Sequence, residues 1–137
     1  MRISQKLEYA CRALAQLAKH HDAHTITRLE ELAQREAVSA NFLVQILNDL
    51  RRAGLVESKR GKEGGYLLAR EPVSITLKEI IDAIDPSLLV CSVSHEGESG
   101  AAVAESWSAV AAAFQEHLSQ ITLAQMIVTP GGSMFYI

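Results

Sequence analysis

The fold is decided by residues 39–70, which read SANFLVQILNDLRRAGLVESKRGKEGGYLLAR. Ser39 is a residue type that caps helices, and after it apolar side chains recur at i, i+3, i+4 and i+7. This spacing predicts a helix over residues 40–53. Gly54 then stands where a left-handed residue is needed to end the helix.

Two β-favouring runs, residues 55–59 and 66–70, follow around a glycine-rich centre and predict a hairpin. Before the decisive stretch, a shorter apolar stripe predicts a helix over residues 28–35, with Thr27 as its cap. Only residues 36–39, which end in the cap Ser39, separate this helix from the next, and so short a connection is typical of a helix-turn-helix. A helix-turn-helix followed directly by a hairpin is a winged helix, so the sequence predicts a mainly α fold with a small β-hairpin wing.

Further helices are predicted on both sides of this unit, with Ser4 and Thr76 as caps. These elements are a helix over 4–19, a helix over 77–84, a loop over 88–100, a long helix from residue 101 and a short helix over 122–128. The predicted parts are a winged-helix DNA-binding domain (1–86), a sensor-type loop (87–100), and a dimerisation helix with a short terminal helix and an apolar tail (101–137).

The long helix carries an apolar stripe that a winged helix does not need for its own core. The stripe consists of Val103, Trp107, Val110, Phe114, Leu118 and Ile121. Burial against a helix of a second subunit would cover it, which predicts a homodimer. The alternative is that the helix packs back on its own domain.

The charge is divided unevenly along the chain. Over all 137 residues, 13 Lys and Arg against 16 Asp and Glu give a net charge of −3. The 13 basic residues lie between Arg2 and Lys78, where nine acidic residues leave +4, whereas residues 79–137 carry seven acidic residues and a charge of −7. Because DNA attracts basic surfaces, the first part is the candidate reader of DNA.

The composition excludes several classes of protein. No apolar run has the length of a membrane span, and the N-terminus lacks the apolar segment of a signal peptide, so we expect a cytoplasmic protein with no membrane partner. Two cysteines exclude a disulfide-rich scaffold.

The run Gly61-x-x-Gly64-Gly65 lacks the Lys-Ser/Thr of a phosphate loop, and no catalytic triad or carboxylate pair is recognisable, so no enzyme is expected. The histidines of residues 20–24 indicate a solvated loop rather than a metal site.

Candidate DNA contacts lie on the outward face of the 40–53 helix and at the hairpin tip. Asn and Gln can pair with adenine, and Ser can reach either base type. The candidate base-reading residues are Ser39, Asn41, Gln45 and Asn48, and the candidate phosphate contacts are Arg2, Lys6, Arg51 and Arg52. The hairpin tip adds Lys59, Arg60 and Lys62, where an Arg can enter a narrow minor groove. The alternative for the helix face is an ordinary solvated surface.

Three stretches resemble the Rrf2 family of bacterial transcription regulators. They are residues 7–14 (LEYACRAL), 39–56 (SANFLVQILNDLRRAGLV) and 58–69 (SKRGKEGGYLLA). The resemblance implies a homodimeric winged-helix DNA binder whose long C-terminal helix forms the dimer, with Asn41, Gln45 and Arg60 at base-reading positions. Val44 departs from the acidic residue usual in the family and can offer only apolar contact, such as with a thymine methyl group. We therefore expect the operator to differ from those of family members that carry an acidic residue at the position of Val44.

The resemblance also implies a sensor function for the 87–100 loop. Cluster-binding members hold iron–sulfur there with three closely spaced cysteines, whereas this loop has Cys91 alone. Cys91, His95 and Glu8 are candidate ligands, but one thiolate is a poor anchor for a soft iron site, so no cofactor is expected. Cys91 as a redox thiol is a second option, although Glu96 and Glu98 disfavour the reactive thiolate. A merely packed cysteine is the third.

The sequence thus predicts a sequence-specific transcriptional regulator, a repressor, that reads a pseudo-palindromic operator as a homodimer. Its predicted partners are double-stranded DNA and a second copy of the chain, while the small-molecule or redox signal stays open. Two alternatives remain: a winged helix that binds other proteins, and a metal- or cluster-dependent sensor.

Overall fold

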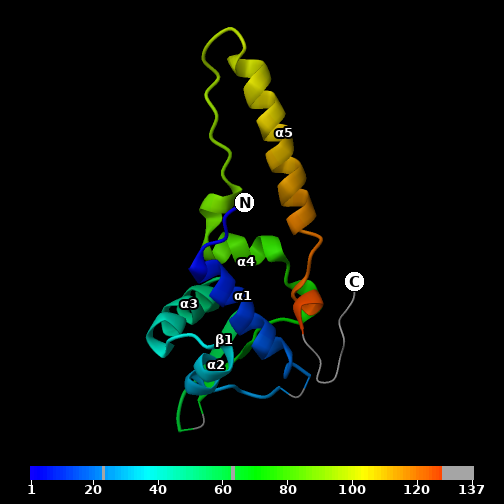
Figure 1. The fold of residues 1–137 in the computed structure, drawn as a ribbon. Helices are drawn as coiled ribbons and strands as arrows, with labels where there is room; N and C mark the ends of the chain where they lie inside the picture. Colours follow the sequence, from blue (N-terminus) through cyan, green and yellow to red (C-terminus); the bar gives the residue numbers. More distant parts are fainter. Residues whose placement is uncertain (23, 63, 128–137) are drawn as a thin grey trace.

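The computed structural model describes residues 1–22, 24–62 and 64–127. Its α-helices are α1 (Gln5–Ala18), α2 (Leu29–Glu36), α3 (Ala40–Arg52), α4 (Leu77–Ile84) and α5 (Gly100–Leu118). The strands β1 (Val56–Lys59) and β2 (Gly65–Leu68) form an antiparallel hairpin, and the 3-10 turns are η1 (Pro72–Ser74), η2 (Pro86–Leu89) and η3 (Leu123–Met126). Figure 1 confirms the predicted mainly α architecture with a hairpin wing. We call α1 to α4 together with the hairpin the head.

The decisive stretch folds as its pattern predicts. The Ser39 hydroxyl accepts a hydrogen bond from the Phe42 backbone N–H at 3.1 Å and caps α3. Beyond the helix, Gly54 has φ +80°, a conformation that glycine adopts without steric cost. The inward side chains of α3 are fully buried; they are Leu43, Ile46, Leu47 and Leu50. The hairpin then pairs in the register from Val56↔Leu68 to Lys59↔Gly65.

The prediction that Thr27 caps α2 is wrong. Arg28 precedes that helix and provides no side-chain cap, while Thr27 pairs with the wing. The Thr27 N–H donates to the Tyr66 carbonyl at 2.9 Å, and the Tyr66 N–H donates to the Thr27 carbonyl at 2.8 Å. Gly65 permits this approach, because a Cβ there would lie 2.4 Å from the Thr27 carbonyl oxygen. The wing is therefore paired on both sides of β2, with β1 and with the segment before α2.

Helix α1 lies at the centre of the head and packs against α2, α3, α4 and β2. Its inward face is buried, with Leu14 at 0% exposure. The same core also takes in Leu118 and Leu123, which are 5% and 0% exposed. The apolar core of the head thus draws on residues well beyond position 86.

The start of α4 joins the head to the chain that follows α5. Thr76 caps α4 as predicted, in a reciprocal capping box with Glu79. The Leu77 N–H donates to the Ile121 carbonyl at 2.8 Å, and the Leu123 N–H donates to the Ile75 carbonyl at 2.8 Å. These bonds hold the segment after α5 against the base of α4.

The stripe predicted for the long helix is divided into two parts. α5 ends at Leu118, so Ile121 lies beyond it, half-buried. Leu118 is buried in the core of its own head, which corrects its assignment to the dimer surface. Phe114 packs against that core but stays half-buried and lines an apolar hollow, so its place at a dimer surface stays a prediction. The physical reason is the backbone pairing at the base of α4, which draws the end of α5 onto the head.

The other part of the stripe is not covered by any described residue, because α5 extends away from the head (Figure 1). Val103, Trp107 and Val110 are 47%, 56% and 57% exposed. The short terminal helix is the 3-10 turn η3 alone, and residues 128–137, including the predicted tail, lie outside the described ranges. Across the described ranges, we find no helix with the length and apolar character needed to cross a membrane.

Candidate nucleic-acid interface

The outward face of α3 presents polar side chains in two rows. Asn41 and Gln45 are exposed and lie one helical turn apart, and Val44 and Asn48 lie half-buried beside them. The Ser39 hydroxyl accepts the capping hydrogen bond, which leaves its O–H donor and its second lone pair for the predicted contact with a base. The face therefore offers two free amide side chains, with an apolar position between them at Val44.

The predicted phosphate contacts differ in how free their charges are. Asp49, on α3, lies 2.6 Å from the Lys6 Nζ and also pairs with the Arg52 guanidinium. Arg2 and Arg51 are exposed, and neither forms an ion pair within the described ranges. Arg51 is thus the predicted phosphate contact on α3 whose charge is fully available.

The wing tip gathers three exposed cations, Lys59, Arg60 and Lys62. Gly61 allows the turn with φ +107°, and Gly64 lies so close to the Lys59 carbonyl that a Cβ would approach its oxygen to 2.4 Å. Among the described residues, Lys59 is the member of this group with an ion pair, because its Nζ lies 4.0 Å from Glu57 Oε1. The glycines are thus explained by a tight turn that presents the basic side chains to solvent.

One basic residue near the wing is missing from the sequence prediction. Arg28 is exposed and lines a hollow between the start of α2 and the wing, together with Lys59 and Arg60. Its signal in the sequence was its position immediately before α2, but the incorrect cap at Thr27 placed Arg28 inside the helix. The pairing of Thr27 with Tyr66 is what brings Arg28 beside the wing.

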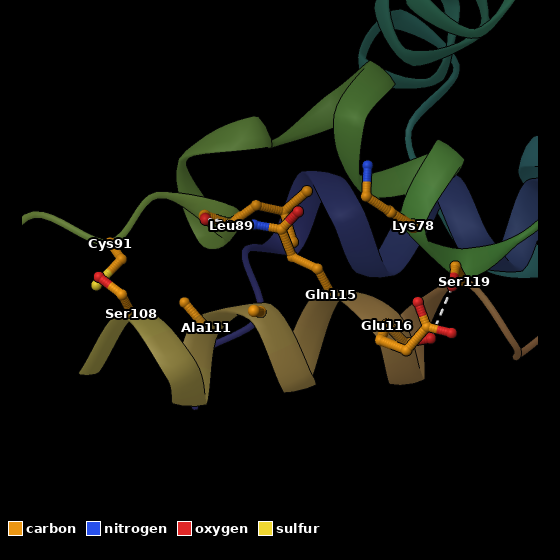
Figure 2. Close-up of a pocket in the computed structure, with 9 residues that line it drawn as sticks. Lys78, Leu89, Cys91, Ser108, Ala111, Gln115, Glu116 and Ser119 are labelled. Atoms are coloured by element: carbon orange, nitrogen blue, oxygen red, sulfur yellow. Dashed lines mark hydrogen bonds between the residues drawn. The ribbon is translucent and has the colours of Figure 1, made fainter. Parts of the chain in front are cut away.

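The three candidate sensor residues lie on separate elements. Cys91 is exposed and faces Ser108 of α5 across a shallow groove (Figure 2). His95 is exposed further along the same loop. Glu8 is exposed on α1 and pairs with Arg12 at 3.0 Å. Within one protomer these side chains do not form a common site in the described ranges, where no group of three potential metal ligands occurs.

The second cysteine is set apart by its burial. Cys11 lies half-buried on α1 and lines an apolar hollow beside Leu7 and Phe114. Desolvation by burial raises the pKa of the Cys11 thiol to about 11 from an ordinary value of 9.0. Cys11 is therefore a protonated thiol at neutral pH.

Comparison with known proteins identifies the family of the chain. The model of the Rrf2 family, described as "Iron-dependent Transcriptional regulator", matches residues 3–129. The chain belongs to the Rrf2 family. It is accordingly a DNA-binding transcriptional regulator of helix-turn-helix type and not an enzyme. The resemblance inferred from residues 7–14, 39–56 and 58–69 is confirmed.

Relatives of this Rrf2-family chain support the assignment along its whole length. The regulator CymR of Bacillus subtilis is 36% identical over 141 residues, covering 100% of both chains. IscR of Escherichia coli is 38% identical over 88 residues, covering 64% of this chain and 54% of IscR. Among solved structures, CymR, titled the global cysteine regulator of B. subtilis, superposes with a TM-score of 0.80 at 35% identity, covering 92% of this chain and 95% of CymR.

The description of the Rrf2 family names iron, and the described residues of this member do not fit an iron site. An iron–sulfur cluster needs several thiolates or substitutes converging on it, whereas within one protomer the described residues contain no group of three potential ligands, and Glu8 is paired with Arg12.

Proposed function

We propose that the chain is a homodimeric transcriptional repressor of the cytoplasm that reads a pseudo-palindromic operator. The observation that carries the proposal is the coincidence of two surfaces on one head: an outward face of α3 with free Asn41 and Gln45 side chains, and a wing tip with three exposed cations. A helix of this kind enters the major groove and reads base edges, while a basic wing enters the neighbouring minor groove.

Each group of residues has a distinct part in this proposal. Asn41 and Gln45 read bases through their amides, with Val44 contacting a thymine methyl group. Arg60 inserts into the minor groove. Arg51 contacts phosphate, as do the members of the wing tip that do not enter the groove.

The dimer is proposed from the uncovered half of the α5 stripe. Val103, Trp107 and Val110 lie on the part of α5 that leaves the head, and aromatic side chains at such positions anchor protein interfaces. An apolar hollow of about 460 Å³ lies between the start of α1 and the end of α5, and its lining includes Ile3 and Phe114. A two-fold pair could cover both surfaces, and two symmetric heads would then read two half-sites.

The test of base reading uses DNA sites that the full-length chain selects from a random-sequence pool. Arg60→Ala and Gln45→Ala should each weaken operator binding by about 1–3 kcal/mol and leave binding to random DNA nearly unchanged. Gln120→Ala is a matched control, because Gln120 is exposed and lies beyond α5. Equal losses on operator and random DNA would show that these side chains contact phosphate only.

The rival function, a module that binds other proteins, is separated by salt. A DNA-binding regulator loses affinity steeply as salt rises, with a slope set by its phosphate contacts. Absence of DNA binding even at low salt would favour the protein-binding module. Repression itself is tested by transcription in vitro from a promoter that overlaps the selected operator, where added protein should lower transcript yield.

We also propose that regulation does not use a resident cluster, since Cys91, His95 and Glu8 are separated within the protomer. Anaerobic purification followed by iron analysis and an absorption spectrum tests this. Stoichiometric iron with visible absorption would instead support the cluster-dependent sensor.

A further inference from the structure

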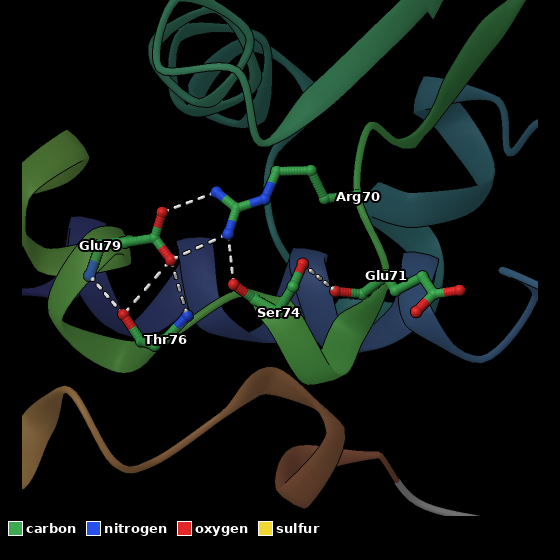
Figure 3. A network of polar contacts seen from close by, with 5 residues as sticks. All are labelled: Arg70, Glu71, Ser74, Thr76 and Glu79. Carbon is green, nitrogen blue, oxygen red and sulfur yellow. Dashed lines mark hydrogen bonds and ion pairs between the residues drawn. The ribbon is translucent and has the colours of Figure 1, made fainter.

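The base of the wing is held by a compact polar cluster that the DNA contacts do not use (Figure 3). Arg70, two residues after β2, places Nη1 2.6 Å from Glu79 Oε2 and Nη2 3.1 Å from Glu79 Oε1. The same Nη2 donates to the Ser74 carbonyl. One guanidinium therefore bridges the η1 turn and grips a carboxylate of α4 with two hydrogen bonds, an arrangement that fixes orientation as well as distance.

The carboxylate that receives Arg70 is itself held in place. Glu79 Oε1 also accepts from the Thr76 backbone N–H at 3.1 Å, as part of the capping box of α4. The hydrogen bond from Arg70 holds the pKa of Glu79 below its ordinary value, so the pair is ionised at neutral pH. The clamp, by which we mean Arg70 with Glu79, thus ties the end of the wing to a rigid helix start.

The position of the clamp matters because a small rotation at the base of the wing displaces the wing tip by a much larger distance. The tip lies about five residues from the base of the hairpin, or roughly 16 Å at ~3.3 Å per residue. A tilt of about 10° at the base would move the tip by roughly 3 Å, whereas a recognition contact tolerates about 0.5 Å. The Thr27 and Tyr66 backbones tie β2 along its length, and the clamp holds the chain just after the end of that strand.

The clamp also meets the chain that follows α5. Leu77 and Ile75, on either side of Thr76, are bonded to Ile121 and Leu123. The helix start that receives Arg70 is therefore the same turn that anchors the end of α5. Wing and proposed dimer helix share one point of attachment.

We propose that Arg70 and Glu79 are positioning residues for DNA recognition, which aim the wing tip and its Arg60 at the minor groove. This inference rests on the proposed function, because it requires that Arg60 contacts the operator. A purely structural ion pair would affect stability without a specific link to Arg60.

The experiment is a double-mutant cycle on operator binding by the full-length chain. Glu79→Gln keeps an oxygen for the capping box but removes the charge that Arg70 grips. We expect it to weaken operator binding about tenfold, within the range for loss of one base contact, and to leave random DNA unaffected. In the Arg60→Ala background the same substitution should have a much smaller effect, because the aim of the wing then matters only for the phosphate contacts of Lys59 and Lys62.

Two further variants separate geometry from charge. Asp82→Asn is the matched control, because Asp82 also lies on α4, pairs with Lys78 at 3.1 Å, and loses the same charge. It should leave operator affinity unchanged. Arg70→Lys keeps the charge but cannot grip both oxygens, so it should reproduce the loss of Glu79→Gln. Thermal unfolding of each variant identifies losses of operator affinity that come from misfolding. If Glu79→Gln does not fold, the operator affinity of Arg70→Lys tests the inference in its place.

The failures are distinguishable. If Arg60→Ala leaves operator affinity unchanged, the wing does not read DNA, and both the proposed role of Arg60 and this inference are wrong. If Arg60→Ala weakens binding but the effects of the two substitutions simply add, the clamp does not act through the wing. A tenfold loss shared by Asp82→Asn, or Arg70→Lys that binds like the unmodified chain, would also overturn the inference.

Discussion

The head and the outer half of α5 differ in how much of their apolar surface they bury. In the head, α1 is surrounded and Leu14 has no exposed surface. On α5, Trp107 is more than half exposed, although it is the largest apolar side chain of the chain. The difference shows that the head has a closed core within one protomer, whereas the outer part of α5 has an apolar surface that residues 1–22, 24–62 and 64–127 leave open.

The charges divide along the same line. The wing tip and the end of α3 present free cations, and residues 79–137 contain no Lys or Arg. A polyanion is therefore attracted to the head and repelled by the acidic part. The two regions differ both in how they are buried and in the partner they attract.

The largest expected effect is in the core of the head. Leu14→Ala should lower the free energy of unfolding by about 2–5 kcal/mol, because it empties a fully buried site at the centre of α1. Urea denaturation measures the loss. A loss of about 0.5 kcal/mol or less, the size typical of a surface position, would mean that Leu14 does not lie in a closed core.

The second effect concerns the open surface of α5. Trp107→Asp should weaken dimerisation by at least about 2 kcal/mol, roughly 30-fold, while protomer stability changes little. Sedimentation velocity over a concentration series measures it. Val73→Asp is the control, since Val73 is 63% exposed on the head. Equal weakening by both variants would remove the contrast between the two regions.

A smaller effect is expected in the salt dependence of DNA binding, where Arg51 and Arg52 should differ. Arg51→Ala should reduce the slope of log affinity against log salt by about 0.9, the value for one phosphate contact on duplex DNA. Arg52→Ala should reduce it less, because Asp49 already pairs with Arg52. Titrations at four or more salt concentrations compare them, and identical slopes for both variants would show that the ion pair does not matter in the complex.

The smallest effect at neutral pH distinguishes the two cysteines. Iodoacetamide at pH 8 should label exposed Cys91 well before Cys11, whose thiol is half-buried with its pKa raised to about 11. The folded state holds the Cys11 proton more tightly than the unfolded state. Its contribution to stability is therefore complete below pH 9 and is lost as the pH rises toward 11.

This sign is measurable in the melting temperature. Between pH 8 and pH 10.5 the unmodified chain should lose more stability than Cys11→Ala. Parallel curves would mean that the thiol is solvated in the folded protein.

Local pattern was sufficient for most of the fold. Helical spacing, the caps Ser4, Ser39 and Thr76, and the position of Gly54 all act within a few residues, and each is found as predicted. Thr27 is the exception among the caps. A threonine before a helix has the right chemistry for a cap, but pairing with Tyr66, 39 residues further on, determines its conformation. That competition is invisible in a local window.

The candidate site was predictable in part for the same reason. The amides of α3 and the cations of the wing follow from helical and hairpin patterns, and their roles on DNA remain predictions. Arg28 was missed because its position beside the wing depends on the Thr27 pairing. Leu118 lies in phase with Trp107 on one helix, and only the tertiary attachment at Ile121 decides that one is covered and the other open.

The hydrogen bonds between residues 75–77 and 121–123 also have a consequence for the order in which the chain folds during synthesis. Leu118 and Leu123 are part of the core of the head, yet they are translated about 40 residues after the end of α4, a delay of roughly 2–8 s at about 5–20 residues per second. A nascent chain thus carries α1 to α4 and the wing before it has the side chains that seal them. The core of the head can be completed only after α5 has been synthesised. A newly made protomer therefore finishes folding with its proposed dimer helix already present.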